Sequence, residues 1–205
     1  MFQREFECPS CGAPILQRTP GARTLVCSYC NQTSHLNADS LQAVGEKHLL
    51  VDYGSVFAIG QSGRYFGREF LVLGRLRIDY EDGFWDEWYI QFLDNGEGAW
   101  IQEDDGSFTL FQQEKTLAQA PALDRIQVGN WNTLNESWEP IFITSKSRAK
   151  VNGGEGELPF RIVPGEPADF VDGLWEGKIV SAELLPDEKV LFIGQPFDLQ
   201  ELEIN

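Results

Sequence analysis

The segment F-L-V-L-G-R-L-R-I-D-Y (70–80), followed by E-D-G-F (81–84) and W-D-E-W-Y-I-Q-F-L (85–93), decides the fold of this chain. β-branched and aromatic residues are frequent in it, and over 75–80 charged side chains alternate with Leu, Ile and Tyr. That period of two is typical of a β-strand with one buried face. An acidic turn that contains Gly83 joins the two strand-like segments, so the sequence predicts an antiparallel hairpin.

The same pattern continues along the chain. Residues 99–103 and 108–112 add two strands to a meander, and a connector at 114–125 follows. Later strands are predicted at 138–146, 148–152, 158–163, 168–172, 178–185 and 189–197, with a Gly-rich turn at 153–156. Turn signals recur every eight to twelve residues, which predicts a mainly β chain with an antiparallel β-barrel or sandwich-like domain.

A weak internal echo lies within this β-rich region, which we place at residues 56–205. Y-E-D-G-F-W (80–85) and F-V-D-G-L-W (170–175) share an aromatic residue, Asp-Gly and Trp at the same offsets. One interpretation is two related halves, 56–113 and 124–205. The other is that Asp-Gly is simply a common turn pair.

Two C-x-x-C pairs hold the four cysteines of the chain: Cys8 and Cys11, then Cys27 and Cys30. Fifteen residues separate the pairs, which is typical of a four-cysteine zinc site. Gly12 and Asn31 follow the pairs and tolerate the left-handed backbone that such turns need. We therefore predict a zinc ribbon at residues 1–37, with a structural zinc ion. Disulfides or a redox pair are the alternatives.

The next segment, residues 38–55, is predicted to be a linker or a short helix. Asp39 or Ser40 is suited to cap such a helix, whereas Gly45 weakens it. The ribbon itself carries a mild positive balance and no basic stripe. A role in docking another protein is therefore favoured over contact with nucleic acid.

Composition limits the function further. The 205 residues include 32 acidic and 16 basic side chains, and the net charge is −16. This charge disfavours nucleic acid as a partner, because phosphate binding needs clustered Lys and Arg. The chain has no run of 18 apolar residues and no signal-like beginning, so we expect no direct membrane insertion. Reduced cysteine ligands favour a cytoplasmic location.

Aromatic residues form the next group of candidates. The six tryptophans are Trp85, Trp88, Trp100, Trp131, Trp138 and Trp175. Because successive side chains of a strand alternate, Trp85 and Trp88 are expected on opposite faces, which leaves one of them a candidate for an exposed binding face. Packing of most tryptophans in a β core is the alternative.

Several segments together resemble the bacterial domain of unknown function 4178 family: G-x-x-F-L-V-L-G-R (67–75), W-D-E-W-Y (85–89), G-A-W-I (98–101) and G-E-G-E-L-P (154–159). The similarity covers roughly residues 56–200, and members often carry a comparable N-terminal ribbon. The matching positions are Gly74, Trp85, Glu87, Tyr89, Trp100, Glu155, Gly156, Glu157 and Pro159. The resemblance implies a β-rich domain with an adaptor role, found in envelope-stress or polyamine-related contexts, and it implies no catalytic residue. Among these positions, the candidate binding residues are Trp85, Glu87, Tyr89, Trp100 and Glu155.

Glu87 raises the possibility of an enzyme. It shares a strand face with Trp85 and Tyr89, which predicts an inward carboxylate with a raised pKa, and Asp86 points to the other face. The alternative is a structural acid bonded to Arg75 or Arg77. The acid pairs Asp104/Asp105 and Glu155/Glu157 are expected to lie in turns and to face water.

The sequence thus favours a non-catalytic binding or adaptor protein whose ribbon and β domain recruit a protein partner. A carboxylate-dependent enzyme that uses Glu87 is the first alternative, and a nucleic-acid-binding ribbon is the second. No residue is predicted to be catalytic, and zinc is the predicted cofactor.

Overall fold

The computed structural model describes residues 2–117, 120–134, 139–184 and 189–205. The N-terminal strands are β1 (Arg4–Glu7), β2 (Pro14–Gln17), β3 (Thr24–Val26), β4 (Thr33–Asn37) and β5 (Ser40–Ala43). The others are β6 (Ser62–Tyr65), β7 (Arg68–Tyr80), β8 (Gly83–Phe92), β9 (Gly98–Asp104), β10 (Ser107–Thr116), β11 (Trp131–Asn132), β12 (Ile141–Ser147), β13 (Ala149–Leu158), β14 (Asp169–Trp175), β15 (Lys178–Leu184), β16 (Lys189–Phe197) and β17 (Leu202–Ile204). Only two short 3-10 helices, η1 (Leu123–Arg125) and η2 (Leu199–Glu201), interrupt the strands of these described ranges, so the prediction of a mainly β chain is confirmed.

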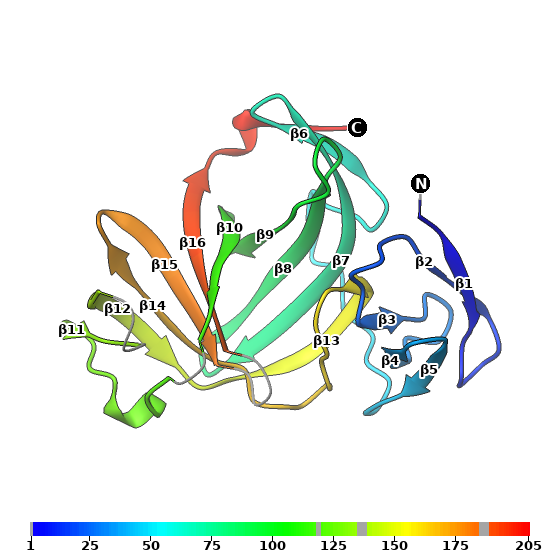
Figure 1. The fold of residues 1–205 in the computed structure, drawn as a ribbon, viewed down its shortest axis with the longest axis horizontal. Coiled ribbons are helices and arrows are strands. Elements are labelled where there is room, and N and C mark those ends of the chain that lie inside the picture. The colour runs from blue at the N-terminus through cyan, green and yellow to red at the C-terminus, as the bar shows by residue number, and fades with distance from the viewer. Residues whose placement is uncertain (1, 118–119, 135–138, 185–188) are drawn as a thin grey trace.

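The strands of the larger domain form an antiparallel sheet that curls back on itself (Figure 1). Its order is β12-β14-β15-β16-β10-β9-β8-β7-β13. β12 and β13 are consecutive and separated by Arg148 alone, yet β12 pairs with β14 whereas β13 pairs with β7. One long segment thus contributes strands near both ends of the sheet, β11 and the ribbon strands lying beyond them, and it closes the sheet into a barrel. The predicted meander forms β7 to β10.

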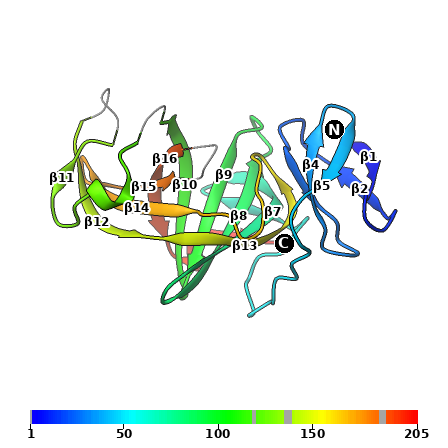
Figure 2. The same cartoon turned by 90° about the horizontal axis from the view of Figure 1, so that it is seen from below.

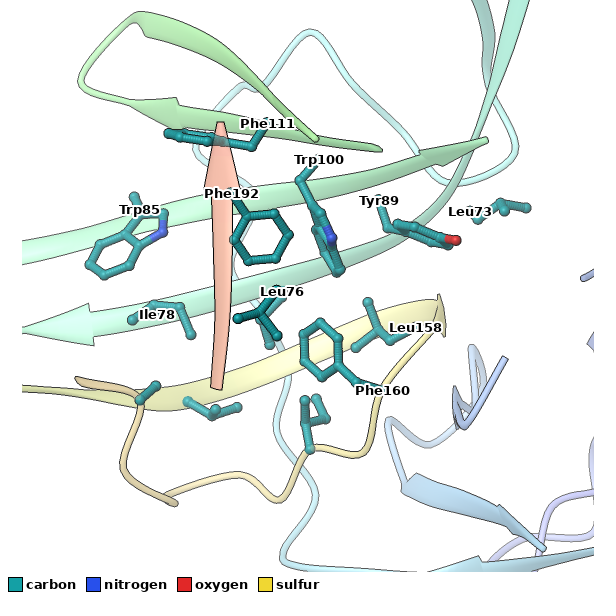
Figure 3. Packing of buried hydrophobic residues seen from close by; sticks show 14 residues of the cluster. Leu73, Leu76, Ile78, Trp85, Tyr89, Trp100, Phe111, Leu158, Phe160 and Phe192 are labelled. Atoms are coloured by element: carbon teal, nitrogen blue, oxygen red, sulfur yellow. The ribbon is translucent and has the colours of Figure 1, made fainter. Parts of the chain in front are cut away.

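Apolar side chains are buried on both faces of this sheet. The interior cluster includes Leu76, Trp85, Trp100 and Phe192, which converge in Figure 3. On the outer face of β7 to β10, Trp88 belongs to a second cluster that β6 and β17 cover. A third cluster lies between the outer face of β12, β14, β15 and β16 and the side chains of Leu117, Ile126 and Leu134. Trp85 and Trp88 therefore lie on opposite faces, as predicted, and both are buried.

Two predictions about the Gly-rich segment are wrong. Residues 153–156 are not a turn but part of β13, and of the strand predicted at 158–163 only Leu158 is in a strand. The glycines serve close packing instead. Gly156 has a φ of 69° and lies opposite Gly74, and a Cβ atom on Gly156 would collide with the carbonyl oxygen of Leu73. Glycine is therefore needed here for the approach of two backbones.

The helix considered within residues 38–55 is absent from the structure. Residues 40–43 form β5, which pairs with β4 and extends the ribbon beyond its predicted end at residue 37. The hydrogen bonds to β4 outweigh the weak local helix preference of this segment.

The two Asp-Gly pairs also differ in position: Gly83 begins β8 after a turn, whereas Gly173 pairs with Ile143 in the middle of β14. The echo therefore does not mark two equivalent hairpins.

The ribbon lies at one end of the molecule. Figures 1 and 2 both show β1 to β5 beside β13 and β7, whereas β11 and β12 lie at the opposite end. β3 pairs with β13, so β3 to β5 of the ribbon continue the barrel sheet, whereas β1 and β2 form a separate two-stranded sheet. In the ranges that the structure describes, no helix is long and apolar enough to cross a membrane.

Candidate functional site

The two cysteine turns have matching backbone geometry. In the first, the N–H of Gly12 donates to the carbonyl oxygen of Cys8 at 2.9 Å, and in the second, the N–H of Asn31 donates to Cys27 at 2.9 Å. Gly12 has a φ of 75° and Asn31 a φ of 57°, which confirms the predicted left-handed positions. Each turn thus brings its two cysteines to one side of a tight loop.

The four sulfur atoms meet at the centre of the ribbon. Those of Cys8, Cys11, Cys27 and Cys30 all lie within 4.8 Å of one another. Cys8 Sγ lies 3.7 Å from Cys30 Sγ, and Cys11 Sγ lies 3.7 Å from Cys27 Sγ. A disulfide would need about 2.05 Å, and all four are free thiols. Four sulfurs placed about 2.3 Å from a central metal ion would be about 3.8 Å apart. The cluster therefore fits a four-coordinate metal ion.

A buried carboxylate joins the ribbon to the barrel. Both oxygens of Glu157, in β13, accept hydrogen bonds at 2.8 Å from the backbone N–H of Arg18, and Oε2 also accepts one from Thr19 at 3.1 Å. Glu157 is only 1% exposed, so the expectation that acids near the Gly-rich segment face water is wrong for this residue. Its partners are backbone groups of a loop 139 positions away in the sequence. No local sequence pattern predicts such a contact.

A groove of about 490 Å³ lies at this junction. Its ribbon wall includes Leu16 and the turn with Cys27 and Tyr29, and its barrel wall includes Ile59 and Glu155. Tyr29 is 72% exposed. The second cysteine turn therefore serves the metal cluster and also forms one side of the groove.

Glu155 is the predicted binding residue that reaches this groove. Its side chain is 34% exposed, and its Oε2 lies 3.4 Å from a terminal nitrogen of Arg75. Arg75 is buried and also donates to Asp86 at 2.8 Å. Arg75 therefore has two acidic neighbours, and Glu155 is the more distant and more exposed of the two.

Asp86, and not Glu87, binds the two arginines. Its Oδ2 accepts from Arg75 at 2.8 Å and from Arg77 at 2.7 Å, and its Oδ1 accepts from Arg77 Nε at 2.9 Å. The alternative that paired Glu87 with an arginine is therefore wrong. The reason is the register, because Arg77 lies opposite Asp86 whereas Glu87 lies opposite Leu76. Opposed residues point to the same face of a sheet.

Glu87 points into the barrel, as predicted. It accepts a hydrogen bond at 2.7 Å from Trp85 Nε1, and burial raises its pKa to about 7. Asp172 lines the same small cavity, and burial raises its pKa as well. That cavity measures about 20 Å³, which holds about one water molecule. Two acids therefore lie beside each other there, with little room for a substrate.

The predicted aromatic binding face is not exposed. Trp85, Tyr89 and Trp100 are 5%, 9% and 7% exposed and belong to the interior cluster (Figure 3). The sheet curls, so a face that would be open in a flat sheet becomes the barrel interior. Trp131, at the opposite end of the molecule, is 66% exposed, and Trp138 lies outside the described residues.

A family model described as domain of unknown function (DUF4178) matches residues 58–197, more than half of the chain. The chain belongs to the DUF4178 family. The matched range covers the DUF4178 barrel and leaves the cysteine ribbon outside it. No curated protein and no solved structure matches the chain.

The residues that carry the DUF4178 resemblance have two places in the structure. Trp85, Tyr89 and Trp100 fill the barrel interior, and Trp85 and Trp100 line the small cavity beside Glu87. Gly74, Glu155, Gly156 and Glu157 lie where β7 and β13 meet the ribbon.

Proposed function

We propose that this protein is a non-catalytic binding module in which a zinc-held ribbon and a DUF4178 barrel together dock a protein partner. The observation that carries the proposal is the groove of about 490 Å³, whose walls come from both parts. Cavities of about 300–1,000 Å³ are typical of pockets that enclose a small ligand, so this groove has room for a few side chains of a partner.

Zinc is the metal that best suits the cluster. Four thiolates in a tetrahedral shell leave no open position, so the ion would stabilise the fold and would not activate a substrate. The same ion would fix the turn of Cys27 and Tyr29, and with it one wall of the groove. Docking would then depend on the metal.

The enzyme that uses Glu87 is the weaker candidate. Glu87 has the second acid, Asp172, that a carboxylate mechanism needs. The space beside the two acids holds about one water molecule, however, and the aromatic side chains of the interior cluster surround it. The groove offers far more room.

Site-specific photo-crosslinking in the native cells tests the proposal. A photoreactive residue replaces Tyr29 in the groove, and the matched control replaces Trp131, which is also exposed but lies at the other end of the molecule. We expect one protein to crosslink from position 29 only and to be lost when Cys8→Ser/Cys11→Ser is added.

The captured protein is then purified, and its affinity is measured for the Tyr29→Ala and Trp131→Ala variants. Weaker binding by the Tyr29→Ala variant alone is the expected result. Crosslinks that are identical from both positions, or absent from position 29, would contradict docking in the groove.

A further inference from the structure

We infer that the groove between the ribbon and the barrel binds an extended, positively charged segment of another protein, in which basic and apolar side chains share one face. This inference rests on the proposed docking function and gives the chemistry of the partner. Three observations carry it: the charges on the groove, its apolar surfaces and the free side of β2.

The charges on the groove are mostly negative. Glu5, Glu155 and Glu157 line it, and its one lining cation in the described residues is Arg18. The Arg18 guanidinium lies 3.5 Å from Glu157, so these two charges offset each other. Glu5 and Glu155 then remain to face a ligand.

Glu155 is only partly neutralised by the protein. Its neighbour Arg75 lies 3.4 Å away, but that guanidinium also donates to the buried Asp86 at 2.8 Å. The chain as a whole has a net charge of −16. The carboxylates of the groove and the negative net charge of the chain would therefore attract a basic segment and repel an acidic one.

Apolar surface lies between these carboxylates. Leu16 and Ile59 are half-buried in opposite walls, and Tyr29 is exposed beside them. Leu16 lies directly opposite Glu5 in the β1–β2 ladder, so one carboxylate and one apolar side chain are neighbours on the same face. A ligand that presents a basic and an apolar side chain two positions apart, on the same face of an extended segment, would match this arrangement.

The free side of β2 favours an extended ligand. β2 lines the groove, and within the described part of the chain its only ladder partner is β1. An unpaired strand edge is a template for another strand, and main-chain hydrogen bonds then supply affinity while side-chain pockets supply specificity.

The test uses the zinc-loaded full chain and three fluorescent peptides of ten residues. One repeats Lys-Ser-Leu-Ser, so that Lys and Leu share one face of the extended peptide, the second has Glu at every Lys position, and the third has Ser at every Leu position. Fluorescence anisotropy at low and moderate salt measures their affinities. We expect the first peptide to bind most tightly and to weaken as salt rises.

Charge removal gives the decisive comparison. The Glu5→Gln/Glu155→Gln variant should bind the first peptide about tenfold more weakly and with less salt dependence. The matched control is Glu81→Gln/Asp82→Asn, which removes the same charge from an exposed turn outside the groove and should bind like the original protein. Circular dichroism verifies that both variants fold.

Three results would overturn the inference: equal binding of the acidic peptide, equal binding by the groove and control variants, or self-association of the protein through the groove without peptide binding. The crosslinking experiment separates this failure from that of the docking function. A neutral or acidic partner captured at position 29 would preserve the docking function and refute the inferred chemistry.

Discussion

Glu157 binds the backbone of Arg18, with both carboxylate oxygens 2.8 Å from that amide nitrogen. Burial raises the pKa of Glu157, while the hydrogen bonds from Arg18 and Thr19 act in the opposite direction. The contact connects β13 of the barrel to the loop between β2 and β3 of the ribbon. Together with the β3–β13 pairing, this contact holds the ribbon against the barrel beside the groove.

Replacing Glu157 should loosen the ribbon. Glu157→Gln removes the charge and leaves one acceptor oxygen for buried N–H groups, so we expect a loss of roughly 2 kcal/mol in the free energy of unfolding. Urea denaturation measures it. Glu155→Gln, a half-exposed neighbour, is the control and should cost below about 1 kcal/mol. Equal losses in the two variants would contradict the role given to Glu157.

Removing the metal should affect the ribbon first. We expect about one zinc ion per chain by elemental analysis and, after chelation, faster hydrogen exchange in β3 and β4 with little change in β15 and β16. Cys11→Ser should behave like the chelated protein. Ser28→Ala, beside Cys27 but without a ligand atom in the cluster, should not. Unchanged exchange in β3 and β4 after chelation would argue against a structural metal.

Breaking the buried ion network should be costly. Asp86 is 5% exposed and holds Arg75 and Arg77, which are also buried. Asp86→Asn leaves two guanidinium groups without their buried counter-charge, so we expect a loss of about 3–5 kcal/mol in unfolding free energy. The exposed Asp82→Asn serves as the control in the same denaturation experiment. A loss within about 0.5 kcal/mol of the control would refute the network's importance.

Glu87 should give the protein a distinctive pH dependence. Burial raises its pKa from 4.5 to about 7, so between these values the folded protein keeps a proton that the unfolded chain has lost. Stability should therefore fall as pH rises through this window, by about 3 kcal/mol in total, and stay level above it.

The pH effect is isolated by comparing variants. Urea denaturation from pH 4.5 to pH 8 should show this decline in the original protein and in Glu81→Gln, and a weaker decline in Glu87→Gln. Parallel curves for Glu87→Gln and the original protein would show that Glu87 does not titrate in this window.

The sequence alone was sufficient for local features. The period of two in residues 70–112 predicted the meander, because strand pairing and turn chemistry act over short distances. The cysteine spacing predicted the cluster for a similar reason, since each C-x-x-C pair folds within one tight turn. The opposite orientations of Trp85 and Trp88 followed from alternation along a single strand.

Only the tertiary structure decided what each face of the sheet meets. Curling of the sheet placed Trp85, Tyr89 and Trp100 in a closed interior. The β7–β8 register placed Asp86 beside the two arginines, whereas Glu87 accepts a hydrogen bond from Trp85. Glu157 accepts its hydrogen bonds from a loop more than a hundred residues away in the sequence. Each of these contacts joins segments that are far apart in the sequence. They form only when the whole barrel closes, so local sequence patterns do not predict them.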